Sequence, residues 1–264
     1  MINYVIACWS GLRRINPKVY IKDRSIFIKK HLKTLFSLKH SIDQVTIVIT
    51  HNPDEPKEFR EYISSLPSVI GSTKIVIIER PNIGYSYGGY SEVFDKYKEE
   101  FEYYMLMEDD YTFMLDNFDK IMINEMQDEK CAFATFWVRL GYKKLILRRI
   151  ERKLDNDKTL IQSVNKYYPD EYYFPIVSVG MVKSKAMSDV CKKYGHMPFS
   201  KSNKHQNNKI EGQFALSTVF QQVGWHITDV NTKYRVSCFS HEGAVAHKGP
   251  KEHPIILAPI QALI

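Results

Sequence analysis

Alternation between apolar segments and helix-like segments over the first 110 residues constrains the fold most strongly. The apolar segments, which predict strands, are residues 3–8, 44–50, 74–79 and 103–107. The segments between them, with apolar side chains mostly at helical spacing, are residues 23–38, 56–66 and 90–100. Strands that are apolar throughout are typical of a sheet covered on both faces. The alternation therefore predicts an α/β fold with a mostly parallel central sheet flanked by helices and joined by right-handed crossovers.

The second half of the chain is less regular. Residues 211–223 carry apolar side chains at helical spacing and are followed by Gly224, which is typical of a helix end. Further strand-like segments are residues 131–138, 172–182, 225–230 and 234–239. Residues 139–170 are poorly patterned, so we expect a flexible insertion there, and the polar residues 201–209 predict a loop. The chain has no repeats and no low-complexity linker, which indicates a single domain over residues 1–264.

Composition narrows the partners and the cellular location. The net charge is +7, a surplus that suits anionic ligands. Much of it lies in residues 139–153, which form either a solvated helix face or a contact with a membrane surface, and which have too few aromatic residues to favour nucleic acid. The four cysteines are far apart, the first residues lack the features of a signal peptide, and no apolar run approaches the ~20 residues that span a bilayer. We therefore expect a cytoplasmic protein.

Polar or glycine-containing segments follow each of the first four predicted strands. They are residues 9–14, 51–54, 80–89 and 108–110. The carboxyl ends of parallel strands open at one edge of a sheet, where ligands bind, so we expect these segments to surround a ligand. Arg13 and Arg80 suit the charge of a diphosphate, and Trp9 suits packing against a base. Solvated arginines and a tryptophan at the edge of the core are the alternatives.

Three consecutive carboxylates, Glu108-Asp109-Asp110, end the fourth predicted strand. Like charges this close repel one another, and a divalent cation removes that penalty. Hard oxygen ligands suit Mg²⁺ or Mn²⁺, which bind one or two carboxylates together with substrate phosphates. A solvated acidic turn is the alternative, but the very apolar strand before the triplet favours a metal site at the ligand edge of the sheet.

The segment YYMLMEDDYTFMLDNFD, residues 103–119, resembles the strand and acidic motif of glycosyltransferases of the GT-A fold. Residues 81–84 (PNIG) are similar to a segment that lies near the nucleotide in many members of this family, and residues 210–227 resemble the family's acceptor-side helix. Only the acidic segment is specific. The resemblance implies a Rossmann-like GT-A domain, with residues 1–110 as its nucleotide-sugar half and residues 111–264 as its acceptor half. Residues 240–254 would then be a lid over the donor.

Roles for individual residues follow from this resemblance. Asp110 would ligate the metal directly, with Asp109 and Glu108 beside it, and a histidine after the last core strand would complete the site. His241 is the first candidate for that histidine and His247 the second. The residues implied to bind the nucleotide sugar are Ala7, Trp9, Arg13, Asn52, Arg80, Asn82, Gly84, Glu108 and Asp109. Trp137 and Gly180 would face the acceptor, although Gly180 also suits a simple turn.

Glu211 is the candidate general base that would take the proton of the acceptor hydroxyl in an inverting transfer. Its alternative role is to complement the dipole at the start of a helix. The family motif has a second acidic residue as the base, whereas this chain has Gly212 at that position, so a retaining reaction without such a base is also open.

The sequence thus favours a metal-dependent enzyme that moves a sugar from a UDP- or GDP-sugar to a hydroxyl acceptor on a glycan, glycoprotein or glycolipid. A nucleotidyltransferase is the second hypothesis, although the first loop has a single glycine where such an enzyme needs several. A non-catalytic module that binds nucleotides or glycans is the third. The sugar, the acceptor and the oligomeric state are not determined by the sequence.

Overall fold

The structure is a computed structural model of the chain. It describes the backbone of residues 1–11, 13–16, 19–21, 25–202, 204–230, 235–236 and 255–259, and the side chains of residues 1–11, 25–175, 179–202 and 204–230. The predicted ligand His241, its alternative His247 and the predicted lid lie outside the described residues.

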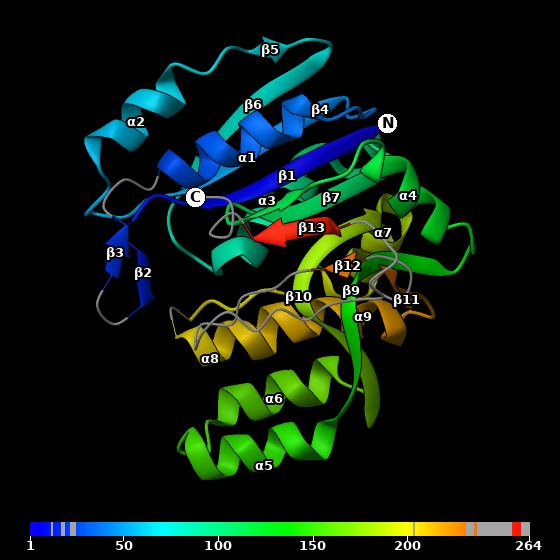
Figure 1. Cartoon of the computed structure of the whole chain (residues 1–264). Helices are drawn as coiled ribbons and strands as arrows, with labels where there is room; N and C mark the ends of the chain where they lie inside the picture. Colours follow the sequence, from blue (N-terminus) through cyan, green and yellow to red (C-terminus); the bar gives the residue numbers. More distant parts are fainter. Residues whose placement is uncertain are drawn as a thin grey trace.

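One eight-stranded sheet forms the centre of the described structure, in the order β11-β9-β10-β7-β1-β4-β6-β5 (Figure 1). Its strands are β1 (Ile2–Trp9), β4 (Gln44–Thr50), β5 (Val69–Ile70), β6 (Thr73–Arg80), β7 (Tyr103–Glu108), β9 (Cys131–Tyr142), β10 (Glu171–Lys183) and β11 (His226–Asp229). The four strands in the middle, β6, β4, β1 and β7, are all parallel. Strand β10 runs antiparallel to both β7 and β9, and β11 runs parallel to β9. The predicted α/β fold with a mostly parallel sheet is confirmed.

Smaller strands lie beside this sheet. They are β2 (Arg13–Asn16), β3 (Val19–Ile21), β8 (Tyr111–Phe113), β12 (Arg235–Val236) and β13 (Ile255–Pro259). Strands β2 and β3 pair with each other, and β13 pairs with both β12 and β8. Because β8 follows Asp110 directly, β13 brings a segment near the end of the chain back to the acidic triplet.

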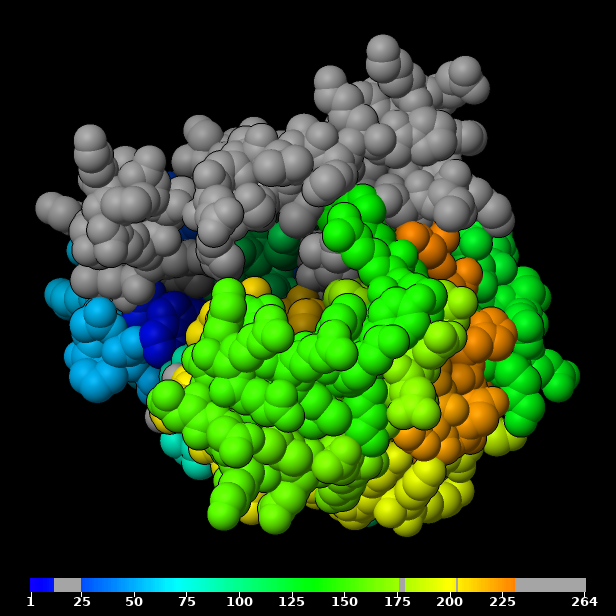
Figure 2. Space-filling view, turned by 90° about the horizontal axis from the view of Figure 1, so that it is seen from below, coloured from blue at the N-terminus to red at the C-terminus, as the bar shows by residue number. Residues whose placement is uncertain are grey.

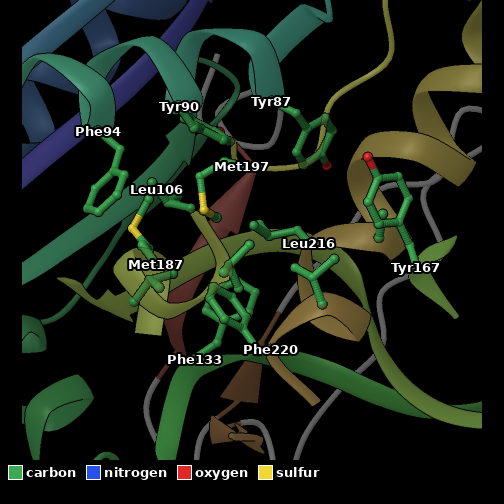
Figure 3. Packing of buried hydrophobic residues seen from close by; sticks show 14 of the residues in the cluster. Tyr87, Tyr90, Phe94, Leu106, Phe133, Tyr167, Met187, Met197, Leu216 and Phe220 are labelled. Carbon is green, nitrogen blue, oxygen red and sulfur yellow. The ribbon is translucent and has the colours of Figure 1, made fainter. Parts of the chain in front are cut away.

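Helices cover both faces of the sheet, and their bounds are α1 (Ser25–Ser37), α2 (Lys57–Ser64), α3 (Tyr85–Tyr97), α4 (Phe118–Glu125), α5 (Lys143–Lys153), α6 (Lys158–Tyr167), α7 (Ser184–Tyr194), α8 (His205–Asn208) and α9 (Ala215–Gln222). A short 3₁₀ helix, η1 (Lys98–Glu100), follows α3, and a π-helical segment, η2 (Lys209–Phe214), joins α8 to α9. Side chains alternate along β1 and point to opposite faces of the sheet. Cys8 belongs to a first core, beneath α1, α2 and α4, whereas Ala7 belongs to a second core, beneath α3, α5, α6, α7 and α9. Figure 3 shows part of this second core.

The prediction of a flexible insertion over residues 139–170 is wrong. Strand β9 continues to Tyr142, and the hairpin of α5 and α6 follows it. Ile146 and Ile150 of α5 and Leu160 of α6 are buried in the second core, while Asp157 caps α6 by accepting hydrogen bonds from two of its first N–H groups. The two buried apolar residues of α5 lie four positions apart on one face, and the many basic residues on the other face hide this periodicity in the sequence.

Three other predictions of secondary structure need correction. The loop expected over residues 201–209 contains α8, and helix α7 was not predicted. The helix expected to begin at Glu211 is a longer helical run that starts at His205. Glu211 therefore does not lie at a helix N-terminus, and the idea that it complements a helix dipole no longer applies.

Candidate functional site

The order of the strands creates a crevice at one point of the sheet. From β1 the chain proceeds outward to β4 and then β6 on one side, and it returns to place β7 on the other side of β1. At such a reversal the loops that leave the carboxyl ends of the two neighbouring strands diverge, and ligands bind between them. Ala7 and Glu108 pair across β1 and β7 at this point.

A pocket of about 270 Å³ lies in this crevice. Its lining residues are Ala7, Cys8, Trp9, Thr50, Tyr85, Ser86, Glu108, Asp109 and Asp110. Five of the predicted site residues thus lie together, namely Ala7, Trp9 and the acidic triplet. Cys8, Thr50, Tyr85 and Ser86 were not singled out from the sequence. Ser86 could have been predicted from the sequence, because it lies two residues after Gly84, the glycine that precedes α3.

The three carboxylates have different surroundings. Asp109 and Asp110 are 4% and 7% exposed, while Glu108 is half-buried. The Asp109 carboxylate accepts hydrogen bonds from the backbone N–H of Trp9 (3.3 Å) and from the thiol of Cys8 (3.6 Å), both on β1. Glu108 accepts a hydrogen bond from the hydroxyl of Ser86 on α3 (3.0 Å). The triplet is therefore attached to the strand on one side of the pocket and to the helix on the other.

Two buried side chains support the triplet from within the protein. His31 of α1 is fully buried, and its Nε2 lies 2.8 Å from the hydroxyl of Tyr4. Burial lowers the pKa of His31 to about 4, against the opposing influence of the Asp109 backbone and the Asp110 carboxylate, so His31 is neutral at pH 7. On the opposite face, burial and then the negative charge of Glu108 raise the pKa of Tyr90 well above its ordinary value. Both residues are therefore uncharged at pH 7 beside the negatively charged triplet.

The donor set in the pocket fits a hard divalent cation. Such ions bind carboxylate oxygens and complete their coordination with phosphates and water. Among the residues that the structure describes, no group of three His, Cys, Asp or Glu side chains forms a metal cage by itself. A cation held by the buried pair Asp109 and Asp110 would thus need ligands from a substrate, from solvent or from parts of the chain outside the described residues.

The N-terminus of α3 forms another wall of the pocket. Gly84 precedes the helix with φ of +79°, a conformation that favours glycine, and Tyr85 and Ser86 line the pocket in the first turn. Free N–H groups and the positive end of the dipole make the start of a helix favourable for a phosphate. Gly88 allows a tight turn here, because a Cβ at this position would lie 2.1 Å from the carbonyl oxygen of Ile83.

Arg80 ends β6, Asn82 and Gly84 lie in the loop between β6 and α3, and none of the three is among the pocket residues. The Arg80 side chain is 7% exposed and donates to the Glu92 carboxylate (2.9 Å). It also donates to the backbone carbonyls of Ile83 (2.6 Å) and Tyr85 (3.4 Å). Its guanidinium therefore holds the loop that positions α3. Because Arg80 does not line the pocket, its positive charge would act on a diphosphate only across this loop.

The loops after β1 and β4 meet beside the pocket. The hydroxyl of Ser10 accepts a hydrogen bond from the Asn52 N–H (3.1 Å) and donates to the carbonyl of Thr50 (3.2 Å). A Cβ at Gly11 would lie 2.3 Å from the Asn52 amide and 2.8 Å from the Trp9 ring, so only glycine permits this approach. Asn52 thus lies close to Trp9, although it is not among the residues that line the pocket. The Arg13 side chain lies outside the described residues.

Glu211 lies apart from the pocket residues, on the π-helical segment η2. Its two carboxylate oxygens accept hydrogen bonds from Ser163 of α6 and from Ser200, both at 2.5 Å. The next residue, Gly212, lies against the ring of Tyr87 on α3, where a Cβ would be 2.5 Å from the ring carbon Cδ2. The packing of Gly212 on Tyr87 therefore places η2, which carries Glu211, against α3.

Trp137 and Gly180 lie on β9 and β10, away from the pocket lining. The Trp137 backbone has φ of +52°, and its N–H donates to the carboxylate of Asp229 (3.1 Å) on β11. A Cβ at Gly180 would lie 2.2 Å from the carbonyl oxygen of Ala134, and φ there is +147°. Gly180 is therefore needed for the packing of β10 on β9. Asp229, which the sequence did not single out, holds the bend at Trp137.

The sequence matches no protein-family model and no curated protein. The fold is similar to that of the mannosyltransferase PcManGT from Pyrobaculum calidifontis, solved with GDP-Man and Mn²⁺, with 10% identity, a TM-score of 0.49, and coverage of 86% of this chain and 54% of that one. It is also similar to HddC from Yersinia pseudotuberculosis (12% identity, TM-score 0.39, 78% and 85% coverage). Mouse xyloside xylosyltransferase 1 is a third similar structure (9% identity, TM-score 0.38, 90% and 88% coverage). This chain spans about half the length of the mannosyltransferase. The likeness is loose, so the function has to be inferred from the site.

Proposed function

We propose that this protein is a metal-dependent glycosyltransferase that uses a nucleotide-diphosphate sugar. The observation that carries the proposal is the pocket at the strand reversal, where the buried pair Asp109 and Asp110 faces the N-terminus of α3. Acidic side chains alone would repel a diphosphate, and a helix N-terminus alone would bind any anion. Together they suit a diphosphate that arrives with a divalent cation.

The residues of the pocket then have distinct tasks. Asp110 and Asp109 would hold Mg²⁺ or Mn²⁺, which neutralises the charge that develops on the departing diphosphate. Tyr85 and Ser86 place the N-terminus of α3 beside the phosphates, and Ser86 also holds Glu108 in place. Trp9 lines the pocket at the end of β1, with Asn52 close to it, and these two residues would contact the nucleoside. Residues 1–110 are thus the donor half and residues 111–264 the acceptor half.

Glu211 is the proposed base of an inverting reaction. Its carboxylate accepts hydrogen bonds from two serine hydroxyls, those of Ser163 and Ser200, which hold it in one orientation. A charged carboxylate is the form that accepts the proton of an acceptor hydroxyl. Gly212, which follows Glu211 in the chain, packs against the ring of Tyr87. Tyr87 directly follows the pocket residue Ser86, so this contact links the segment of the proposed base to the donor pocket.

The test of this proposal is the variant Asp110→Asn, with Asp54→Asn as its matched control. Asp54 is exposed in the loop after β4 and does not line the pocket. A thermal-shift panel of UDP- and GDP-sugars with and without Mn²⁺ identifies the donor, and the release of UDP or GDP is then measured. We expect Asp110→Asn to lose Mn²⁺-dependent donor binding and at least about 100-fold in rate, which is typical when electrostatic stabilisation of a leaving group is removed. Its melting temperature without ligand should remain close to that of the wild type.

Full activity of Asp110→Asn would exclude the metal assignment. Release of pyrophosphate from a nucleoside triphosphate would instead indicate a nucleotidyltransferase. Binding of a nucleotide sugar and Mn²⁺ without any turnover, in the presence of a broad acceptor panel, would indicate a binding module.

A further inference from the structure

Helix α5 carries an unusual concentration of positive charge. Its sequence, KKLILRRIERK, contains six basic residues and a single acidic one. Five of the basic residues are exposed, and they are Lys144, Arg148, Arg149, Arg152 and Lys153. Within the described part of the chain, Arg149 donates to the side chain of Gln206 (3.1 Å) and Lys144 lies over the Tyr142 ring (5.6 Å), but none of the five forms an ion pair with a carboxylate. Within the described residues, no ion pair therefore offsets the repulsion within this group.

The charges surround an apolar side chain on the outward face of the helix. Ile146 and Ile150 bury the inner face against the second core. Leu145, Arg148 and Arg152 follow one another at spacings of three and four residues, so they lie together on the opposite, outward face. Leu145 is 53% exposed and precedes both arginines on this face. In water this leucine buries little of its apolar surface, and it gains a partner only where the face binds something apolar as well as anionic.

Two more exposed apolar residues lie where β9 leads into α5. Leu140 and Tyr173 pair across β9 and β10 and are 42% and 52% exposed. The hairpin of α5 and α6 forms a broad, convex part of the surface that faces the viewer in Figure 2. A convex surface with cations around leucine and tyrosine lacks the groove and stacked aromatic residues that bind single-stranded nucleic acid. It matches a lipid interface, which offers anionic headgroups and an apolar layer beneath them.

We propose that the outward face of α5, with Leu140 and Tyr173 beside it, docks the protein on an anionic lipid surface. The helix has 11 residues, and no described helix of this chain is long and apolar enough to cross a bilayer, so α5 would lie in the plane of the interface. The lysines and arginines contact lipid phosphates, while Leu145 enters the apolar layer. The docking itself does not depend on the proposed enzymatic function.

A consequence for the reaction, which does rest on the proposed function, concerns the acceptor. Ser163 on α6 donates a hydrogen bond to Glu211, so the hairpin that would lie on the lipid also holds the candidate base. Docking through α5 would orient the acceptor half of the molecule toward the membrane, which suits an acceptor that is itself anchored in the lipid.

Sedimentation with vesicles tests the docking directly and needs no enzymatic activity. The wild-type protein is mixed with vesicles of phosphatidylcholine alone and with vesicles in which about a third of the lipid is phosphatidylglycerol. We expect binding to the anionic vesicles only, and we expect it to weaken as NaCl is added because salt screens the charges. Each cation near such a surface contributes about a fivefold factor in affinity, so the double variant Arg148→Glu/Arg152→Glu should bind at least about 25-fold more weakly.

The matched control is Lys192→Glu/Lys193→Glu on α7, an exposed basic pair with the same change of charge. Its effect should be much smaller than that of the α5 variant. Leu145→Trp should show a blue-shifted tryptophan emission with anionic vesicles, and unchanged melting temperatures show that all the variants are folded. The proposal is overturned if the two double variants lose binding equally, if the wild type does not bind the anionic vesicles at low salt, or if it binds a single-stranded oligonucleotide more tightly than these vesicles. Loss of vesicle binding with normal activity on a soluble acceptor would leave the proposed enzymatic function intact.

Discussion

Replacing Gly212 by alanine should destabilise this protein, although the same change stabilises most helices. Within a helix, alanine is favoured over glycine by about 0.5–1 kcal/mol, because the unfolded glycine chain has more freedom to lose. Here a Cβ would lie 2.5 Å from Cδ2 and 2.8 Å from Cγ of Tyr87. Carbon atoms in good contact are separated by about 3.5–4.0 Å, so the new methyl group would be about 1 Å too close.

The ring of Tyr87 has little room to retreat. It is 7% exposed and packs edge-on against Tyr90, with ring centroids 5.8 Å apart (Figure 3). Extra atoms in such a site cost about 1–3 kcal/mol. After the gain from replacing glycine is subtracted, we expect Gly212→Ala to lower the free energy of unfolding by about 1 kcal/mol, within a range of about 0–2.5 kcal/mol.

Urea denaturation of a double-mutant cycle measures this effect. Tyr87→Ala removes the ring and should cost about 3 kcal/mol by itself. In that background Gly212→Ala should become stabilising by about 0.5–1 kcal/mol, so its sign reverses. Gly224→Ala serves as control, because Gly224 has φ of +85° and open space around it, so its cost should not depend on Tyr87. If Gly212→Ala stabilised the wild-type protein, the close contact between this position and the Tyr87 ring would be refuted.

Two further predictions concern the candidate base and a buried thiol. Glu211→Gln should lower kcat by about 100-fold or more and leave the affinity for the donor nucleotide unchanged, because glutamine keeps the shape of the side chain but cannot accept a proton. Steady-state kinetics measures kcat, and titration with the nucleotide measures the affinity. An unchanged kcat would show that Glu211 is not the base. Burial raises the pKa of the Cys131 thiol to about 11, which reduces the reactive thiolate at pH 8 about a hundredfold below that of an ordinary cysteine. Alkylation followed by mass spectrometry should therefore find Cys131 slow to react in the native protein and fast in urea, and rapid native labelling would contradict the packing around β9.

The strands in the middle of the sheet were the most accurate part of the sequence analysis. The bounds of β4 are those predicted, and β7 differs from the predicted strand by one residue. These strands are buried on both faces, so nearly every side chain in them is apolar, and the local sequence alone reveals them. By contrast, α3 begins five residues before the predicted start, because Gly84 and the close approach of Gly88 to Ile83 permit a helix where glycines suggested a loop.

The hairpin of α5 and α6 shows the opposite case. Its buried residues are Ile146 and Ile150 of α5 and Leu160, Val164 and Tyr167 of α6, and many of their partners come from distant parts of the chain. A helix that gains its stability from packing on one narrow face cannot be recognised from propensity or composition. Residues 139–170 therefore looked unstructured until the second core was visible.

The sequence by itself determined that three carboxylates end a buried strand at the ligand edge of an α/β sheet. It could not determine what lies opposite them. Only the tertiary structure placed β7 beside β1, brought Ser86 of α3 and Trp9 of β1 to the same pocket, and set His31 and Tyr4 behind the triplet. The physical reason is that strand order and the packing of helices depend on pairings between residues far apart in the chain, whereas the pattern that predicts a strand is local.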